Sequence, residues 1–255
     1  MTRLVGRVAA IAMMVIVQGS FAHAAELRLF STIGVQGAVE ELLPLFEKVT
    51  GNKVVPTWST AAMLVKRIQG GETADLYILT RTGIDALAKE GKVVPSSAVT
   101  LASSGIALAV KAGAPKPNIS TPEALKATLL NAKAVAYSDP AAGGASGVYF
   151  ANLLERMGIA DQMKAKAKFP PPGGNSASLL LTGEADIAVQ QTPEIMYVKG
   201  VDIIGVLPGD YNSVTVFGAG IAPDSKNTAA ADLLIKSMQS PEARAVFRSR
   251  GLDPS

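Results

Sequence analysis

The sequence predicts an α/β protein made of two lobes with a cleft between them. Residues 26–81 alternate short apolar strands with amphipathic helices in the order β-α-β-α-β, a pattern typical of a parallel sheet with right-handed crossovers. Two further apolar stretches, near residues 105 and 213, are candidate crossings from one lobe to the other and back. Two crossings imply that the C-terminal segment completes the first lobe. The assignment is lobe 1 over residues 25–107 and 214–255, and lobe 2 over residues 108–213.

Residues 54–81 display the strand–helix–strand pattern most clearly. After a β-branched run, Trp58, Ser59 and Thr60 form a predicted turn whose hydroxyls can cap a helix. Apolar residues then recur at helical spacing up to Gly70, and residues 76–79 are continuously apolar, as in a strand covered on both faces. This strand ends in a threonine and an arginine. Because ligands of open α/β sheets bind at the carboxyl ends of strands, we expect a small anion to bind here.

The first 24 residues have the features of a secretory signal peptide. Arg3 and Arg7 supply a positive start, residues 8–17 form an apolar core, and Ala22 to Ala24 is an A-x-A cleavage site. The apolar run is short for a membrane span, which favours cleavage over anchoring. We expect export with cleavage after Ala24.

The composition excludes several kinds of catalysis. The chain has no cysteine, and its one histidine, His23, lies in the leader. The mature chain therefore cannot use a Ser-His-Asp or Cys-His mechanism or build a usual zinc site. Carboxylate catalysis by Asp75, Asp139 or Asp186 is the remaining enzymatic alternative, but acids placed before apolar strands usually bind loop N–H groups. We expect a binding protein, without a cofactor and without enzymatic activity.

The charge balance also limits the partners. A formal net charge of +3, evenly spread over the chain, is too small to indicate binding of nucleic acid. A cleft between two lobes is a common place for a small-molecule site, so a small ligand is favoured instead.

The second half of the chain supplies further candidate ligand groups. Ser138 follows the predicted strand at residues 134–137, and Ser146 lies in a glycine-rich loop that opens a helix. Such a loop exposes backbone N–H groups that suit an anion, although a plain capped turn would look the same. Asn175 and Ser176 precede another helix, and Gln190 ends the next strand.

Several short motifs together resemble the type II periplasmic solute-binding proteins of ABC transporters, most closely the molybdate-binding branch. They are Ser31-Thr32, Leu45-Phe46-Glu47-Lys48, Trp58-Ser59-Thr60, Ala74-Asp75-Leu76-Tyr77-Ile78, Asp139-Pro140, Gly183-Glu184-Ala185-Asp186 and Ser240-Pro241-Glu242-Ala243. The resemblance implies two Rossmann-like lobes joined by a hinge, with an interlobe cleft that closes on an anion. It also implies a periplasmic location and delivery of the anion to an inner-membrane permease. We expect the protein to be a monomer.

Departures from the branch pattern favour a small organic carboxylate as the ligand. Arg81 stands where the branch usually has an aspartate, and Gln190 stands where a tyrosine is common. A guanidinium matches a carboxylate with two parallel hydrogen bonds, so Arg81 is the predicted clamp. The polar ring predicted around it is Ser31, Thr32, Ser59, Thr60, Ser138, Ser146, Asn175, Ser176 and Gln190.

The sequence leaves three alternatives open. Arg81 could instead form a surface salt bridge, for example with Asp85, and individual hydroxyls could simply cap helices. The ligand could be a molybdate- or tungstate-type oxyanion held by neutral hydroxyls. The protein could also present its ligand to a membrane receptor as a sensor.

Overall fold

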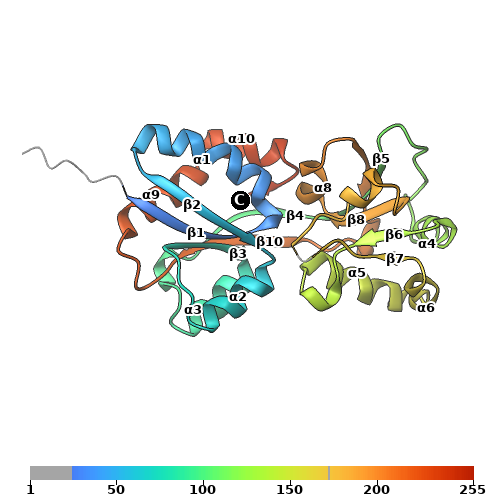
Figure 1. Ribbon diagram of the computed structural model, residues 1–255, viewed down its shortest axis with the longest axis horizontal. Coiled ribbons are helices and arrows are strands. Elements are labelled where there is room, and N and C mark those ends of the chain that lie inside the picture. Colours follow the sequence, from blue (N-terminus) through green and yellow to red (C-terminus); the bar gives the residue numbers. More distant parts are fainter. Residues whose placement is uncertain (1–24, 172) are drawn as a thin grey trace, which may run out of the picture.

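The computed structural model describes residues 25–171 and 173–255, and the predicted signal peptide lies outside them. Two lobes lie side by side along the long axis, each with its own sheet and its own helices (Figure 1). This arrangement confirms the predicted two-lobed α/β fold. None of the helices in the described part of the chain is long and apolar enough to cross a bilayer.

The first lobe is built on a six-stranded mixed sheet in the order β11-β4-β10-β3-β1-β2. Its strands are β1 (Glu26–Thr32), β2 (Lys53–Ser59), β3 (Leu76–Thr80), β4 (Val99–Ser104), β10 (Thr215–Ile221) and β11 (Asp253–Pro254). β1 pairs in parallel with β2 and β3, which confirms the pattern predicted for the first strands. β10 runs antiparallel to both of its neighbours, because the chain returns through it from the other lobe.

Helices cover both faces of this sheet. They are α1 (Gln36–Thr50), α2 (Ala61–Gln69), α3 (Arg81–Lys89), α9 (Thr228–Met238) and α10 (Pro241–Ser249), with short 3-10 turns η1 (Ile33–Val35) and η2 (Pro95–Ser97). Leu29 and Ile78 pack with α1, α9 and α10, whereas Phe30 and Tyr77 pack with α2 and α3. Successive strand residues point to opposite faces, so one strand fills both cores.

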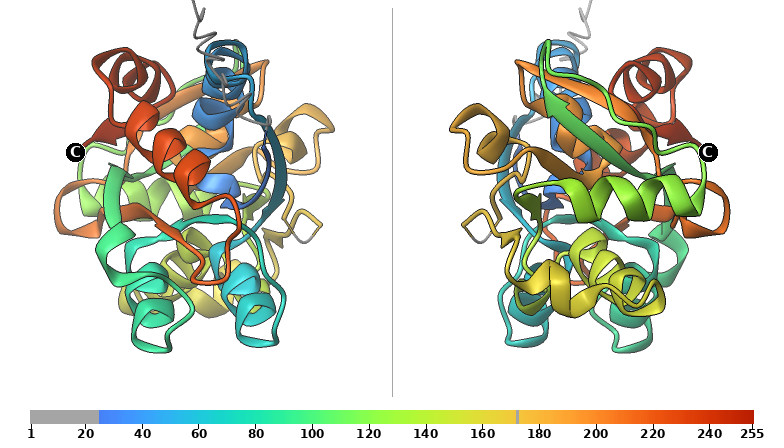
Figure 2. Two further views of the ribbon diagram at one scale, coloured as in Figure 1. Left: turned by 90° about the vertical axis from the view of Figure 1, so that its left-hand side faces the viewer. Right: turned by 90° about the vertical axis from the view of Figure 1, so that its right-hand side faces the viewer.

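The second lobe has a five-stranded sheet in the order β7-β6-β8-β5-β9. The strands are β5 (Ile106–Lys111), β6 (Val135–Tyr137), β7 (Ala167–Lys168), β8 (Ile187–Gln191) and β9 (Val201–Val206). The helices are α4 (Pro122–Asn131), α5 (Ala145–Arg156), α6 (Ala160–Lys164), α7 (Ser178–Leu181) and α8 (Thr192–Tyr197), with 3-10 turns η3 (Pro140–Ala142) and η4 (Gly209–Tyr211). α4, α5 and α6 pack on one face of the sheet, and α7 and α8 pack on the other. Figure 2 views the two lobes end-on.

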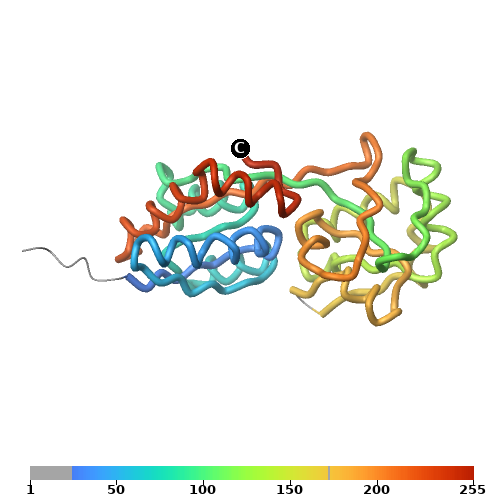
Figure 3. Tube along the Cα trace, turned by 90° about the horizontal axis from the view of Figure 1, so that it is seen from above, coloured from blue at the N-terminus to red at the C-terminus, as the bar shows by residue number. Residues whose placement is uncertain are grey.

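The chain passes between the lobes twice, and the two connections run close together (Figure 3). Only Gly105 separates β4 of the first sheet from β5 of the second. The apolar run predicted as one strand over residues 100–110 is therefore two strands in two sheets, and the predicted lobe boundary after residue 107 falls inside β5. The return passes through η4 and enters β10 at Thr215.

Two local predictions are corrected. Trp58 and Ser59 belong to β2 rather than to a turn, and the turn is reduced to Thr60, which caps α2. Pro44, for which the sequence predicts a kink or a shifted start, lies inside the continuous helix α1. Both Pro44 and Glu40 are exposed, so the Glu40 carbonyl that loses its helical donor can bind water instead.

Candidate ligand site between the lobes

A pocket lies in the cleft where strands of both lobes end. The first lobe contributes residues at the ends of β1 and β3, at the start of α2 and in β10: Thr32, Ile33, Thr60, Ala61, Thr80, Thr215 and Phe217. The second lobe contributes Ser138, Asp139, Ala142, Gly144, Ala145, Ser146, Pro170, Pro171, Gly173, Gly174, Gln191 and Glu194. The carboxyl ends of strands thus form the site, as the fold class leads one to expect.

Four residues of the predicted polar ring line this pocket: Thr32, Thr60, Ser138 and Ser146. Two of them also cap turns. The Thr60 hydroxyl accepts from Met63 N at 3.3 Å and donates to Ala142 O of the other lobe at 3.4 Å. Thr32 accepts from Gly34 N at 3.4 Å. The hydroxyl-bearing residues Thr32 and Thr60 therefore both cap a helical turn and line the pocket.

The glycine-rich loop before α5 forms one wall of the pocket. Gly144, Ala145 and Ser146 line it, and no side chain caps the N-terminus of this helix. The N–H groups of its first turn have no partner within the helix, and the positive end of the helix dipole lies here. The first turn of α5 packs closely on Ser138: a Cβ at Gly147 would lie 2.0 Å from the Ser138 carbonyl oxygen. Backbone N–H groups are thus presented to an anion.

Arg81 does not line the pocket. Its Nε donates to Asp85 Oδ1 at 2.9 Å, and its Nη1 donates to Thr100 Oγ1 at 3.1 Å. Arg81 is the first residue of α3, so Asp85 lies one turn further on the same helix face. The structure has the salt bridge that the sequence left open as an alternative, and the carboxylate clamp at Arg81 stays a prediction.

Ser31 and Ser59 also lie outside the pocket lining. Ser31 is fully buried in β1, with its hydroxyl 3.4 Å from the Thr32 carbonyl oxygen. The Ser59 hydroxyl lies 3.7 Å from the Met63 sulfur. Neighbouring residues of a strand point to opposite faces of the sheet, and of these two Thr32 lines the pocket.

Asn175, Ser176 and Gln190 form a polar layer beside the pocket rather than lining it. Ser176 donates to Gln190 Oε1 through its backbone N at 2.8 Å and through its hydroxyl at 2.7 Å. The Asn175 side-chain amide donates to the backbone carbonyl of Glu194, and its oxygen accepts from Ala177 N. Gln190 Nε2 is buried and has no hydrogen-bond partner among the described residues.

Glu194 is among the pocket residues that sequence reasoning missed, with Gln191, Thr215 and Phe217. It lies in α8, and only 9% of its surface is exposed. Burial raises the pKa of its carboxyl to about 8, and the neighbouring Gln190 side chain opposes this shift only in part. The carboxyl is therefore mostly neutral at pH 7. A sequence signal existed: Thr192-Pro193-Glu194 follows the end of β8, and a proline there marks a helix start at the cleft edge.

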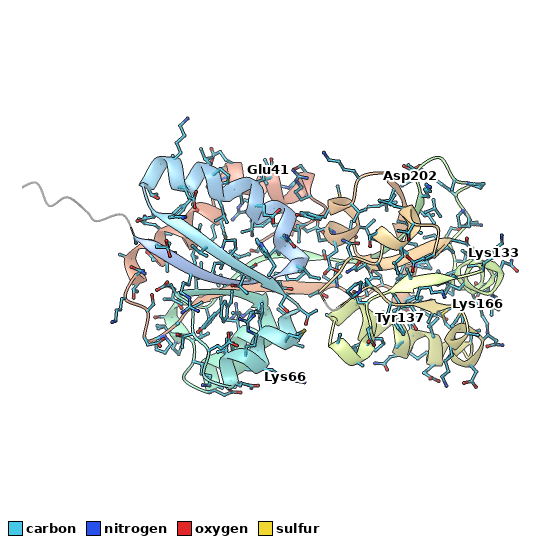
Figure 4. The ribbon with its side chains drawn as sticks, in the orientation of Figure 1. Glu41, Lys66, Lys133, Tyr137, Lys166 and Asp202 are labelled. Atoms are coloured by element: carbon cyan, nitrogen blue, oxygen red, sulfur yellow. The ribbon has the colours of Figure 1, made fainter. Side chains whose placement is uncertain are left out.

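Few ionisable side chains line the pocket. Asp139 and Glu194 are the acidic residues among those that line it, and no lysine or arginine is among them. Lys133 and Lys166 lie at the far end of the second lobe, away from the cleft (Figure 4). No group of three or more metal-ligating side chains occurs in residues 25–171 and 173–255. Neutral hydroxyls, backbone N–H groups and the carboxyl groups of Asp139 and Glu194 are what the pocket offers a ligand.

The other aspartates singled out from the sequence have structural roles. Asp75 accepts from Arg28 N at 2.8 Å and from the Ser225 hydroxyl at 2.7 Å. Asp186 accepts from Lys133 N at 2.7 Å. Asp186 thus binds a loop N–H group, as predicted for acids that precede buried strands, whereas Asp75 binds an N–H group of β1 and a hydroxyl.

The lobes also touch at the rim of the cleft. The Tyr197 hydroxyl, at the end of α8, donates to Glu40 Oε2 at 2.9 Å, and Gln36 Nε2 donates to the same hydroxyl at 3.4 Å. Both partners lie in α1 of the first lobe. These contacts join α8 of the second lobe to α1 of the first.

Two α/β lobes joined by two crossings, with a hydroxyl-lined pocket at the strand ends between them, define a bilobal solute-binding protein. The model of the family described as bacterial extracellular solute-binding protein matches residues 27–253, and the chain belongs to this family. This confirms the type II periplasmic solute-binding class, on the molybdate-binding-protein-like branch, that the sequence motifs indicated.

Relatives that are similar in sequence have names that indicate different functions. The chain is 35% identical over 234 residues to the aconitate isomerase of a Pseudomonas species, covering 89% of this chain and 87% of that protein. It is 22% identical over 234 residues to the molybdate-binding protein ModA of Escherichia coli K12, covering 91% and 90%. The solved periplasmic molybdate-binding protein of Azotobacter vinelandii superposes with a TM-score of 0.72 at 21% identity, covering 89% and 98%.

Proposed function

We propose that the cleft binds a small organic polycarboxylate of the aconitate class and that this chain delivers it to an ABC permease. The observation that carries the ligand class is Glu194, a mostly neutral carboxylic acid in a pocket without cationic side chains. A neutral acid can donate a hydrogen bond to a ligand carboxylate, and hydrogen bonds to a charged acceptor are the strong ones. The greater identity to a protein named aconitate isomerase than to two molybdate-binding proteins, 35% against 22% and 24%, supports the same class.

A molybdate- or tungstate-type oxyanion is the second candidate ligand. The specific observation that favours it is the set of hydroxyls at Thr32, Thr60, Ser138 and Ser146, which can hold an oxyanion without a positive side chain. The absence of Arg81 from the pocket lining also removes one of the features that set this chain apart from the molybdate-binding branch.

A thermal-shift series on residues 25–255 separates the two candidates. The ligands are cis- and trans-aconitate, citrate and tricarballylate on one side, and molybdate, tungstate and sulfate on the other. A ligand present at 100 times its Kd stabilises the folded chain by about 2.7 kcal/mol, which raises the Tm by several degrees. We expect the shift with polycarboxylates. A shift confined to molybdate and tungstate would select the second candidate.

The expectation that the chain binds its ligand without changing it stays a prediction. The name of the Pseudomonas relative, aconitate isomerase, indicates a second activity to test at the same site, the isomerisation of the ligand. Glu194 is the pocket residue relevant to that activity.

A further inference from the structure

We infer that Glu194 is a catalytic proton carrier that moves a hydrogen between the two ends of the allylic system of a bound aconitate, so that the cleft isomerises its ligand. The inference rests on the proposed polycarboxylate ligand and goes beyond binding. It needs neither histidine nor cysteine, which the mature chain lacks.

The position of Glu194 is well defined by its surroundings. The amide of Asn175 donates to its backbone carbonyl. Two residues earlier, Thr192 donates to the Gly105 carbonyl through its backbone N at 3.0 Å and its hydroxyl at 2.9 Å. These bonds fix the start of α8 against the crossing between the lobes, so the carboxyl that projects into the pocket is attached to a rigid support.

The wall around the carboxyl is close and partly apolar. A Cβ at Gly34 would lie 2.7 Å from the Phe217 ring and 3.4 Å from Glu194 Oε1, so both side chains flank this glycine. Phe217 is 2% exposed and also lines the pocket. A carboxylate in such surroundings is poorly solvated, which makes it a stronger base toward a carbon acid.

The reaction balances without an added reactant. Aconitate carries a CH2 group and a CH group on either side of a carbon that bears the central carboxylate. The Glu194 carboxylate takes a proton from the CH2 carbon, and that C–H electron pair spreads over the three-carbon allylic system and its carboxylates. The Glu194 acid then returns the proton to the other end carbon, where a C–H bond forms. The double bond has moved by one position, and the geometry at reprotonation sets cis or trans.

The pocket can stabilise the charge that develops during this transfer. The hydroxyls of Thr32, Thr60 and Ser138 and the N–H groups at the start of α5 are available to the ligand carboxylates as negative charge grows on them. Hydrogen-bond donors that are already in place lower the activation barrier in this way, because they need not reorient during the reaction. Asp139 is the other ionisable residue of the pocket lining, and the lysines of the second lobe labelled in Figure 4 lie far from the cleft.

Binding alone does not account for a glutamate at this position. Once ionised, the Glu194 carboxylate repels an anionic ligand, whereas a glutamine would donate the same hydrogen bond at every pH. A carboxyl group differs from an amide in that it can accept and return a proton. The raised pKa, about 8, brings that exchange close to the working pH.

The test follows trans-aconitate by proton NMR in D2O with the chain over residues 25–255. We expect cis-aconitate to appear and deuterium to enter the ligand carbons. Glu194→Gln should lower the turnover at least about 100-fold, the usual contribution of a positioned acid–base group, while calorimetry gives a Kd within about tenfold of the unchanged chain. Glu184→Gln, the same change at an exposed glutamate of the second lobe, should leave turnover unchanged.

A second variant keeps the test valid if Glu194→Gln does not fold. Glu194→Asp keeps the carboxyl but withdraws it by one methylene, so turnover should fall with little change in KM. In the unchanged chain kcat should rise with pH through the ionisation of Glu194, and the midpoint should move in Glu194→Asp. Isomerisation that persists within threefold in Glu194→Gln or Glu194→Asp would overturn the inference.

The experiment distinguishes a failure of the catalytic role from a failure of the proposed ligand. Aconitate that binds the unchanged chain without isomerisation or deuterium exchange overturns the catalytic role and leaves the polycarboxylate ligand in place. Aconitate that does not bind at all refutes the proposed ligand, and the inference falls with it.

Discussion

The side-chain oxygen of Asn212 accepts a hydrogen bond from the backbone N of Ile106 at 3.1 Å and so joins the two crossings between the lobes. A Cβ on the intervening Gly105 would lie 2.8 Å from the Asn212 amide nitrogen, which shows how closely the two connections pack. Motion of one lobe against the other must therefore bend both connections together at this contact.

Asn212→Ala should destabilise the chain by about 1–2 kcal/mol. Ile106 is 1% exposed, so its N–H would lose a partner that water cannot readily replace. Chemical denaturation measures the change, and Asn118→Ala in the exposed loop before α4 is the matched control. A loss no larger than that of the control would mean that the contact does not hold the crossings together.

Glu194 should make the stability of the chain depend on pH in a defined direction. Its pKa is higher in the folded chain, about 8, than its ordinary value of 4.5, so the folded chain holds an extra proton between these two values. The stabilisation is complete below about pH 4.5 and is lost as the pH rises through about 8, at roughly 1.4 kcal/mol per pH unit at most.

The measurement compares the unchanged chain with Glu194→Gln by denaturation between pH 5 and pH 9. The variant lacks the titrating group. As the pH rises, its free energy of unfolding should therefore increase relative to that of the unchanged chain. Parallel pH profiles of the two chains would mean that Glu194 titrates normally in the folded state.

Tyr197→Phe should weaken ligand binding by a few-fold, because the hydroxyl that joins α8 to Glu40 holds the lobes together at the rim. One such hydrogen bond contributes about 0.5–1.5 kcal/mol, and the partly exposed position favours the lower end. Calorimetry with the ligand identified by the thermal-shift series gives the affinity. Tyr149→Phe is the control, since the Tyr149 hydroxyl donates to Tyr211 O at 3.1 Å within one lobe and should affect stability rather than affinity.

Arg81→Ala should leave the ligand affinity within twofold, because the guanidinium is held by Asp85 and Thr100 outside the pocket lining. Ser146→Ala provides the contrast: Ser146 is 3% exposed and lines the pocket, so its loss should weaken binding by about tenfold, equivalent to one good hydrogen bond. Titrations of both variants decide the point. A large loss on removing Arg81 would restore the carboxylate clamp predicted from the sequence.

Much of the site could be anticipated because strand ends and helix caps are local features. Thr60 stands between an apolar strand and a helical repeat, and in the structure it caps α2 and lines the pocket. Glu194 could have been placed at the cleft edge from the proline before it, but its burial could not. Part of that burial comes from η1, which is distant in sequence and packs on α8 only when the lobes meet.

The sequence by itself determined the two-lobed α/β fold, the parallel start of the first sheet and the helix cap at Thr60. These follow from hydrophobic periodicity and capping, which act over a few residues. Only the tertiary structure decided that Arg81 pairs with Asp85 and that Glu194 is buried in the cleft. The reason is physical: the choice between the two roles that the sequence offered for Arg81, and the pKa of a buried carboxyl, depend on groups brought together by folding.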